Sequence, residues 1–381
     1  MSPLALIRAI TLVAYMAVNG SRLVIVLRGL DLGATPQEAG ILSGLLWFFP
    51  LLLSWPVGRL ADRFGSRWLL AAGTAAGAVG MLLPYFDPGL PALFVAAAMA
   101  GLWNSLFHVT TQSLTQVLSG PAALTRNFVF YSMIGSVCNF SGPMLGGNAI
   151  EYLGHEVTFL AMASASFVCM VMLAVWAHLL PRGEPAPVVR NNMLRTLADR
   201  EVQRVLAVSA LVQVSLDLFP LYLPIYGRSI GLSPSTIGNL VGVVFISAFV
   251  AQMVLARVVS RFGERNVIST SFVTAMCGFL LMPLADGAIA LGLVACVFGM
   301  AMGSGHPITS MLLSSRAPGG RPAESLGFRL SINNAVRLVA PTALGSLGTA
   351  LGLVPMFCVT AAMMACGLAL SRRLTFRSHG S

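Results

Sequence analysis

Long runs of apolar residues alternate with short polar segments along the whole chain. A helix needs about 20 residues to cross a hydrocarbon core of about 30 Å, and these runs have that length. Membrane-spanning strands would show shorter segments of alternating polarity, so the pattern favours helices. We predict twelve membrane spans, over residues 6–27, 38–57, 68–86, 91–117, 127–150, 157–180, 204–227, 236–256, 266–285, 288–315, 327–348 and 352–371.

The same pattern occurs twice, at an offset of 198 residues without a gap, as from Arg59 to Arg257. Equivalent positions share glycines, prolines and arginines, among them Gly40 and Gly238, Gly65 and Gly263, and His108 and His306. An internal repeat of this size indicates two structural units built to one plan.

The repeat predicts the domain organisation. Residues 1–180 are expected to form one six-helix bundle and residues 204–381 the other. Residues 181–203 combine prolines with charged residues, which is typical of a linker between domains. The expected fold class is therefore an all-α membrane protein, with twelve transmembrane helices in two pseudosymmetric bundles.

Composition excludes a soluble domain. Hydrophobic residues make up 56% of the chain and charged residues 9%, and the mean hydropathy is +0.83. A soluble domain carries about 25% charged residues. The chain is therefore expected to work in a lipid bilayer. The six cysteines form no CxxC pair and no HExxH segment occurs, so we predict neither a metal site nor a cofactor.

The net charge of +10 comes from arginine, because the chain contains no lysine. With the N-terminus in the cytoplasm, the loop arginines fall on the inner side, and only Arg28 and Arg228 lie outside. The positive-inside rule then predicts a multi-pass protein of the inner (plasma) membrane with both termini cytoplasmic. The positive charge is thus explained by the orientation of the protein in the membrane, so nucleic acid is not an expected partner.

The loop between the second and third spans resembles the signature loop of the major facilitator superfamily. The residues that carry the resemblance are Gly58, Asp62, Arg63, Gly65 and Arg67. The glycines permit a tight turn, and Asp62 suits a helix N-terminus, where backbone N–H groups favour an anion. In the family this loop is a conformational switch of the alternating-access cycle. The second copy has Ser260 in place of Asp62, which predicts an asymmetric switch.

The fifth span carries Gly142, Pro143, Gly146 and Gly147, which resemble the GPxxGG motif of the drug:proton antiporter branch. Small residues let helices approach closely, and proline bends a span. The fourth span lacks the intramembrane arginine of that branch and reads Ala-Ala-Ala-Met-Ala over residues 96–100. Proton coupling must therefore use other groups.

Few ionisable residues lie deep in the spans, and several polar residues join them at helical spacing. A charge at the centre of a membrane helix costs roughly 2.5–3.5 kcal/mol, so each such residue is expected to be functional or paired. The resemblance implies that the first, fourth, seventh and tenth spans face a central cavity. The candidates for the substrate and proton site are Asn19, Arg22, Asn104, His108, Gln213, Asp217, His306 and Arg337.

Structural interpretations of these residues stay open beside the functional ones. His108 and His306 are repeat equivalents and titrate near neutral pH, so they are proton carriers or hydrogen-bonding packing groups. Asp217 is either a protonatable acid in the cavity or the ion-pair partner of Arg22. Arg337 is either a substrate contact or a structural partner.

Function follows from the resemblance and from this charge balance. Arg22 and Arg337 outweigh Asp217, which favours an anionic or zwitterionic substrate. We expect a proton-coupled secondary transporter of a small organic solute that works by alternating access and functions as a monomer, and not an enzyme. The alternatives are a multidrug:proton efflux antiporter, a membrane sensor that does not transport, and a metal-dependent membrane enzyme.

Overall fold

The computed structural model describes residues 2–53, 65–119, 123–176, 178, 180, 200–315 and 322–374. Every regular element in these ranges is a helix. The first half contains α1 (Pro3–Asp31), α2 (Pro36–Leu45), α3 (Phe48–Leu53), α5 (Ser66–Phe86), α6 (Leu90–Val117) and α7 (Leu124–Trp176). The second half contains α9 (Arg200–Ser229), α10 (Pro234–Phe262), α11 (Glu264–Leu281), the 3-10 turn η2 (Met282–Leu284), α12 (Ala288–Met302), α13 (Gly305–Ser315), α14 (Pro322–Leu351) and α15 (Leu353–Arg372).

Local sequence explains where the helices begin. Thr35 caps α2 with its side chain, Glu38 completes a capping box, and Pro36 stands in the first turn. The repeat equivalent is Ser233, which caps α10 before Pro234. These two caps explain why both halves turn sharply at the same place in their sequence.

The helices match the predicted spans with several differences, and two of them affect the number of spans. Ten segments of the described chain are long and apolar enough to cross a membrane. α7 runs through two predicted spans and is broken at Gly154, where φ is +78°. α14 has 30 residues but is not among the ten, because Arg329, Asn333 and Arg337 lower its hydropathy. Dividing α7 and adding α14 is consistent with twelve spans.

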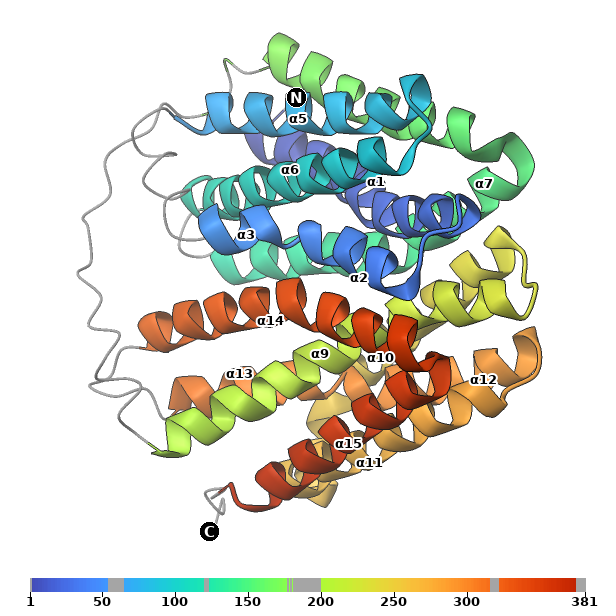
Figure 1. Ribbon diagram of the computed structural model, residues 1–381. Coiled ribbons are helices and arrows are strands. Elements are labelled where there is room, and N and C mark those ends of the chain that lie inside the picture. The colour runs from blue at the N-terminus through green and yellow to red at the C-terminus, as the bar shows by residue number, and fades with distance from the viewer. Residues whose placement is uncertain are drawn as a thin grey trace.

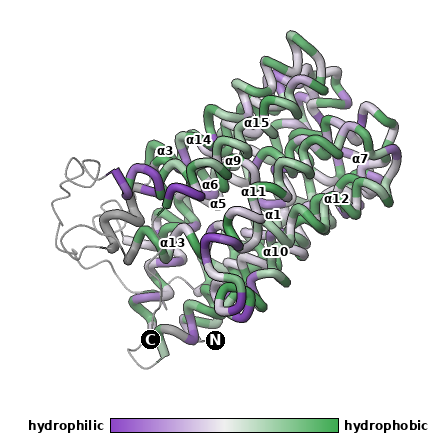
Figure 2. The backbone as a smooth tube through the Cα atoms, turned by 90° about the horizontal axis from the view of Figure 1, so that it is seen from below, coloured by the Kyte–Doolittle hydropathy of each residue, from purple (hydrophilic) through white to green (hydrophobic). Residues whose placement is uncertain are grey.

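The two halves of the chain occupy two sides of the molecule. Figure 1 shows α1 to α7 in the upper part and α9 to α15 in the lower part. Apolar residues cover most of the length of the helices (Figure 2). The predicted linker, residues 181–203, lies outside the described residues except for 200–203, which begin α9. The domain boundaries therefore stay predictions.

Glycine allows the halves to touch backbone to backbone. A Cβ atom at Gly238 of α10 would lie 2.6 Å from the carbonyl oxygen of Pro143 in α7. The repeat equivalents meet in the same way, because Gly40 of α2 lies against the carbonyl of Pro341 in α14. The α7–α10 and α2–α14 contacts are therefore equivalent under the internal repeat.

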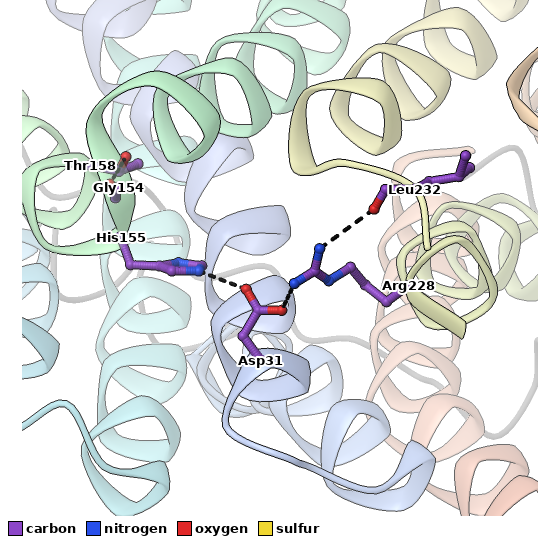
Figure 3. A network of polar contacts seen from close by, with 6 residues as sticks. All are labelled: Asp31, Gly154, His155, Thr158, Arg228 and Leu232. Atoms are coloured by element: carbon purple, nitrogen blue, oxygen red, sulfur yellow. Dashed lines mark hydrogen bonds and ion pairs between the residues drawn. The ribbon is translucent and has the colours of Figure 1, made fainter. Parts of the chain in front are cut away.

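Polar contacts close one end of the molecule, which we name the outer end after the predicted orientation. Asp31 at the end of α1 pairs with Arg228 at the end of α9 and accepts a hydrogen bond of 2.7 Å from His155 Nε2 (Figure 3). Two further hydrogen bonds join the halves nearby. The backbone N–H of Ser235 donates to Glu151 (3.1 Å) and that of Gln37 donates to Thr349 (3.0 Å).

Candidate functional site

The repeat creates a cavity between the two halves. Six pairs of its lining residues are repeat equivalents: Asn19 and Asp217, Arg22 and Pro220, Leu23 and Leu221, Val26 and Pro224, Ser43 and Val241, and Trp47 and Phe245. Equivalent positions from both halves line one space, so the cavity lies on the pseudosymmetry axis. It holds about 70 Å³ of water-accessible space. A single water needs roughly 10–15 Å³ on this measure, so the space fits a few waters or a small polar group.

Asp217 is the one carboxylate among the described residues that line this cavity. Its Oδ2 atom accepts a hydrogen bond from Arg337 Nε at 2.7 Å and another from Gln213 Nε2 at 2.8 Å. The aspartate partner of Arg337 therefore comes from α9 of the same half. Arg22 also interacts electrostatically with Asp217 across the halves, but the close ion pair of Asp217 is with Arg337.

Arg22 lies on α1 at the same cavity without an acidic partner in the described part of the chain. Its buried Nε atom has no hydrogen-bond partner there. Its guanidinium carbon lies 4.5 Å from the ring centroid of Trp47, and that of Arg337 lies 3.8 Å from the same ring. Cation–π contact therefore stabilises both charges in a place where water is scarce.

Trp47 is a site residue that the sequence interpretation missed. It is 7% exposed, follows α2, and is the tryptophan that both arginines contact. A usable signal existed, because its repeat equivalent is Phe245 and both positions are aromatic. Aromatic residues at matched positions of the two copies point to a shared wall of the central cavity.

A polar ladder continues from Asp217 toward the other end of α9 and α14. Arg329 is 3% exposed, and its Nε atom donates to Ser209 Oγ at 2.6 Å. Its Nη1 atom donates to Ser310 of α13. The stripe Ser209, Gln213 and Asp217 thus faces the stripe Arg329, Asn333 and Arg337, and the four-residue spacing in both helices sets this register.

The first half has aromatic residues where the second half has this ladder. Tyr15 of α1 contacts His108 of α6, and its hydroxyl lies 2.5 Å from that of Tyr131 in α7. Thr111 Oγ1 is 3.2 Å from the Tyr131 hydroxyl. Tyr131 is the repeat equivalent of Arg329. The two halves therefore use one geometry with different chemistry.

The two predicted histidines are both accessible to solvent. His108 belongs to the tyrosine cluster, whereas His306 stands in the first turn of α13 and accepts a hydrogen bond from Ser310 through its backbone carbonyl. In the described part of the chain no hydrogen bond or ring contact joins the two rings. Asn104 is half-buried on α6, one turn before His108, and does not line the central cavity.

The predicted switch loop is only partly described. Gly58, Asp62 and Arg63 lie outside the described residues. Gly65 has φ +79° and precedes α5. Arg67 donates to the backbone carbonyls of residues 178 (3.3 Å) and 180 (2.6 Å). The repeat equivalent, Arg265, donates to the carbonyl of Arg372 at 2.6 Å. Each arginine thus ties the start of one span to the last span of its half.

The glycine-rich motif of α7 packs on two neighbours. A Cβ atom at Gly142 would lie 2.9 Å from the carbonyl of Met16 in α1, and Gly146 faces the same helix. On the other side, a Cβ atom at Gly147 would lie 2.5 Å from the carbonyl of Pro234 at the start of α10. Pro143 lines the central cavity. The motif therefore holds α1 and α10 close to the site.

A family model described as Major Facilitator Superfamily matches residues 9–226 and 205–380, which together cover nearly the whole chain. The chain belongs to the major facilitator superfamily. It is therefore a multi-pass membrane transporter and not an enzyme. In the described residues, no group of three or more His, Cys, Asp or Glu side chains could hold a metal ion.

The chain resembles named proteins over most of its length, but at low sequence identity. The chain is 24% identical over 316 residues to the tetracycline resistance protein, class H, of Pasteurella multocida, covering 79% of this chain and 77% of the relative. It is 26% identical over 341 residues to the multidrug resistance protein MdtH of Citrobacter koseri, covering 84% and 81%. The solved structure of the nucleoside transporter NupG has a TM-score of 0.80 at 14% identity, covering 98% of this chain and 99% of NupG. That likeness supports the fold.

Proposed function

We propose that this superfamily member moves a small organic solute with an anionic group, either an anion or a zwitterion, in a cycle coupled to protons. The observation that carries the proposal is the charge balance of the cavity between the halves. Among the described residues at the cavity there are two guanidinium groups, those of Arg22 and Arg337, and one carboxylate, that of Asp217. One positive charge is left for a ligand to neutralise.

An unpaired arginine inside a membrane protein costs free energy, so its retention calls for a function. Arginine presents a planar fork of donors that matches a carboxylate or phosphate with two parallel hydrogen bonds. The Nε atom of Arg22 is one donor of that fork and is free among the described residues. An anionic group of the solute fits it chemically.

The remaining wall of the cavity is mostly apolar, with Trp47, Phe245, Leu23 and Val241 among its residues. Sites of this kind use a few polar groups to orient a ligand and apolar area to bind the rest. A solute with one anionic group on a small apolar or aromatic body matches the chemistry of this wall, and the two units must move apart to admit it.

Alternating access supplies the transport step of the proposal. The two units, residues 1–180 and 204–381, would rock about the cavity, with both termini in the cytoplasm and the monomer as the working unit. Asp217 is the proposed proton carrier, and His108 and His306 are solvent-accessible titratable groups beside the pathway.

A ligand screen tests the proposal. Binding to the folded state raises its thermal stability, so the purified protein is heated with organic acids, amino acids and lipophilic cations at two pH values. We expect organic anions or zwitterions to raise the melting temperature. Stabilisation by lipophilic cations alone would contradict the anion proposal.

The second candidate is a multidrug:proton efflux antiporter. Two observations favour it: the glycine-rich motif of α7, and the similarity to relatives that are named for multidrug and tetracycline resistance. Proteoliposomes loaded with a fluorescent lipophilic cation separate the candidates. Release of the cation on imposing a proton gradient would support efflux. If a proton gradient in neither direction causes release, efflux is excluded.

A further inference from the structure

We infer that Asp217 acts as a built-in anion that competes with the substrate for Arg337, so that a proton and an organic anion bind together and the transporter couples them as a symporter. This inference rests on the proposed function, because it needs an anionic substrate at the same site. It adds the sign of the coupling, which neither the fold nor the relatives provide.

The geometry places the competing groups in one polar cluster. Asp217 holds Arg337 through Nε at 2.7 Å, and Gln213 fixes the same carboxylate oxygen at 2.8 Å. Arg337 and Arg22 both lie over the Trp47 ring. A ligand anion at Arg22 therefore meets the carboxylate of Asp217 within the same small cavity.

Charge decides which partners bind together. With Asp217 ionised, a second anion at Arg22 is attracted by one surplus positive charge and repelled by a carboxylate in a poorly hydrated space, where such repulsion is strong. A proton on Asp217 removes the repulsion and frees the guanidinium of Arg337. The site then carries two positive charges, and the anion can bind both arginines.

The other charged and titratable groups around Asp217 must be named. On its own helix, Gln213 is neutral; from α14 the facing group is Arg337, and from α1 it is Arg22. The residues of α10 at the cavity, Val241 and Phe245, are apolar. Arg337 also interacts electrostatically with His108 of α6 and His306 of α13, so these two histidines need a control.

Thermodynamic linkage turns this local competition into a coupling mode. If a proton on Asp217 raises the affinity for the anion, the bound anion raises the affinity for the proton by the same factor. The doubly loaded state is then the stable one, so the two ligands cross together. A cationic substrate would have the opposite linkage, because it would compete with the proton, and that linkage leads to antiport.

The test measures how binding of an anion depends on pH. Benzenesulfonate is the probe, because the sulfonate stays ionised from acidic to weakly alkaline pH and only the protein titrates. Calorimetric titration of the purified wild-type protein should show affinity rising as the pH falls, by up to about tenfold per pH unit for one linked proton. Titration in buffers with different heats of ionisation should show net proton uptake on binding.

The variant Asp217→Asn mimics the protonated acid. We expect it to bind benzenesulfonate as tightly as the wild type does at acidic pH, with no pH dependence and no proton uptake. Arg22→Gln should lose binding at every pH. A variant with His108→Gln and His306→Gln should keep the pH slope of the wild type, which separates Asp217 from the histidines.

The outcomes distinguish the two proposals. If neither the wild type nor Asp217→Asn binds benzenesulfonate or any organic anion of the screen, the proposed function fails and this inference fails with it. If the wild type binds the probe with an affinity that does not change with pH, or releases protons on binding, only the inference of symport is overturned. Proton uptake is measured on the unmodified protein, so the test does not depend on the folding of a variant.

Discussion

At the scale of residues, the two halves share a geometry and differ in charge. Asn19 faces the cavity where the second half has Asp217, and Arg22 stands where the second half has Pro220. Because the backbone positions are equivalent, each difference puts a charge on one side of the pseudosymmetry axis and none on the other. The chemistry of the site is therefore concentrated where the repeat is broken.

The tyrosine cluster of the first half leads to a prediction about stability. Tyr131→Phe removes a hydroxyl that contacts Tyr15, His108 and Thr111. The remaining buried polar groups lose a partner, so we expect the variant to be destabilised by about 1–3 kcal/mol. Tyr152→Phe is the matched control, because Tyr152 is 78% exposed.

Thermal unfolding of the two tyrosine variants in the same detergent provides the measurement. The melting temperature of Tyr131→Phe should fall and that of Tyr152→Phe should stay at the wild-type value. Equal melting temperatures for all three proteins would show that the cluster contributes nothing to stability.

The sequence predicts which side chains share a helix face, but not how faces pair. The stripe Ser209, Gln213 and Asp217 and the stripe Arg329, Asn333 and Arg337 both follow from helical spacing. Which arginine forms the ion pair with Asp217 depends on how the neighbouring helices pack and on the rotamers of their side chains. The sequence interpretation named Arg22 as the possible ion-pair partner of Asp217, whereas the structure pairs Asp217 with Arg337.

At the scale of elements, glycines set how closely the halves approach. The α7–α10 and α2–α14 contacts repeat the same arrangement, in which a glycine of one helix lies against a proline carbonyl of the other. No side chain lies between the two backbones at these contacts, so any side chain added there must push the helices apart. We therefore expect these contacts to control the closure of the molecule near its outer end.

Gly238→Ala tests this control. The added Cβ would lie 2.6 Å from the Pro143 carbonyl oxygen and 2.9 Å from Gly147 Cα, and both are backbone atoms. Overpacking of this kind costs about 1–3 kcal/mol, which we expect to weaken the closed outer end. Gly135→Ala on α7 is the matched control, because a Cβ there meets nothing within 4 Å.

Spin labels can report on the closure. Leu32 and Ile230 are repeat equivalents near the ends of α1 and α9, and each is 37% exposed. With labels at Leu32→Cys and Ile230→Cys in a background without the native cysteines, Gly238→Ala should broaden the distance distribution or shift it to longer distances. A distribution unchanged from that of Gly135→Ala would contradict a role of this glycine in closure.

Element boundaries show what hydropathy can and cannot predict. The predicted span 288–315 exists as α12 and α13, separated at residues 303 and 304. The break occurs where Gly303 packs directly on the backbone of Ala248 in α10. A tertiary contact of this kind leaves hydropathy unchanged, so a pattern of apolar residues cannot reveal it.

At the scale of the whole molecule, the apolar pattern and the internal repeat predicted the fold class, and the family resemblance implied a cavity between the halves. They could not predict which end would be closed, because one sequence must be compatible with more than one state of a transporter. Some contacts of the closed outer end occur at equivalent positions, as Gln37–Thr349 and Glu151–Ser235 do, but the ion pair Asp31–Arg228 does not. Arg228, for example, is a leucine, Leu30, in the first copy, so the repeat alone gives no sign of the pair.

The last prediction concerns the pair Asp31–Arg228, which joins the two halves at the outer end with His155 as a third member (Figure 3). The side chains of Asp31 and Arg228 are 18% and 34% exposed, so solvent screens part of their attraction. Removing such a pair costs about 1 kcal/mol or less, which corresponds to a shift of up to about fivefold in a two-state equilibrium.

We therefore expect Asp31→Asn and Arg228→Gln each to raise the population with an open outer end, measured with the same pair of labels. The double variant should open it no further than the single ones, because both remove one interaction. Glu201→Gln is the matched control, since Glu201 pairs with Arg204 at 2.6 Å within a single helix. If the control opens the outer end as far as Asp31→Asn does, the effect comes from lost charge in general. If neither single variant opens it, the glycine contacts beneath the pair are sufficient to keep the halves together.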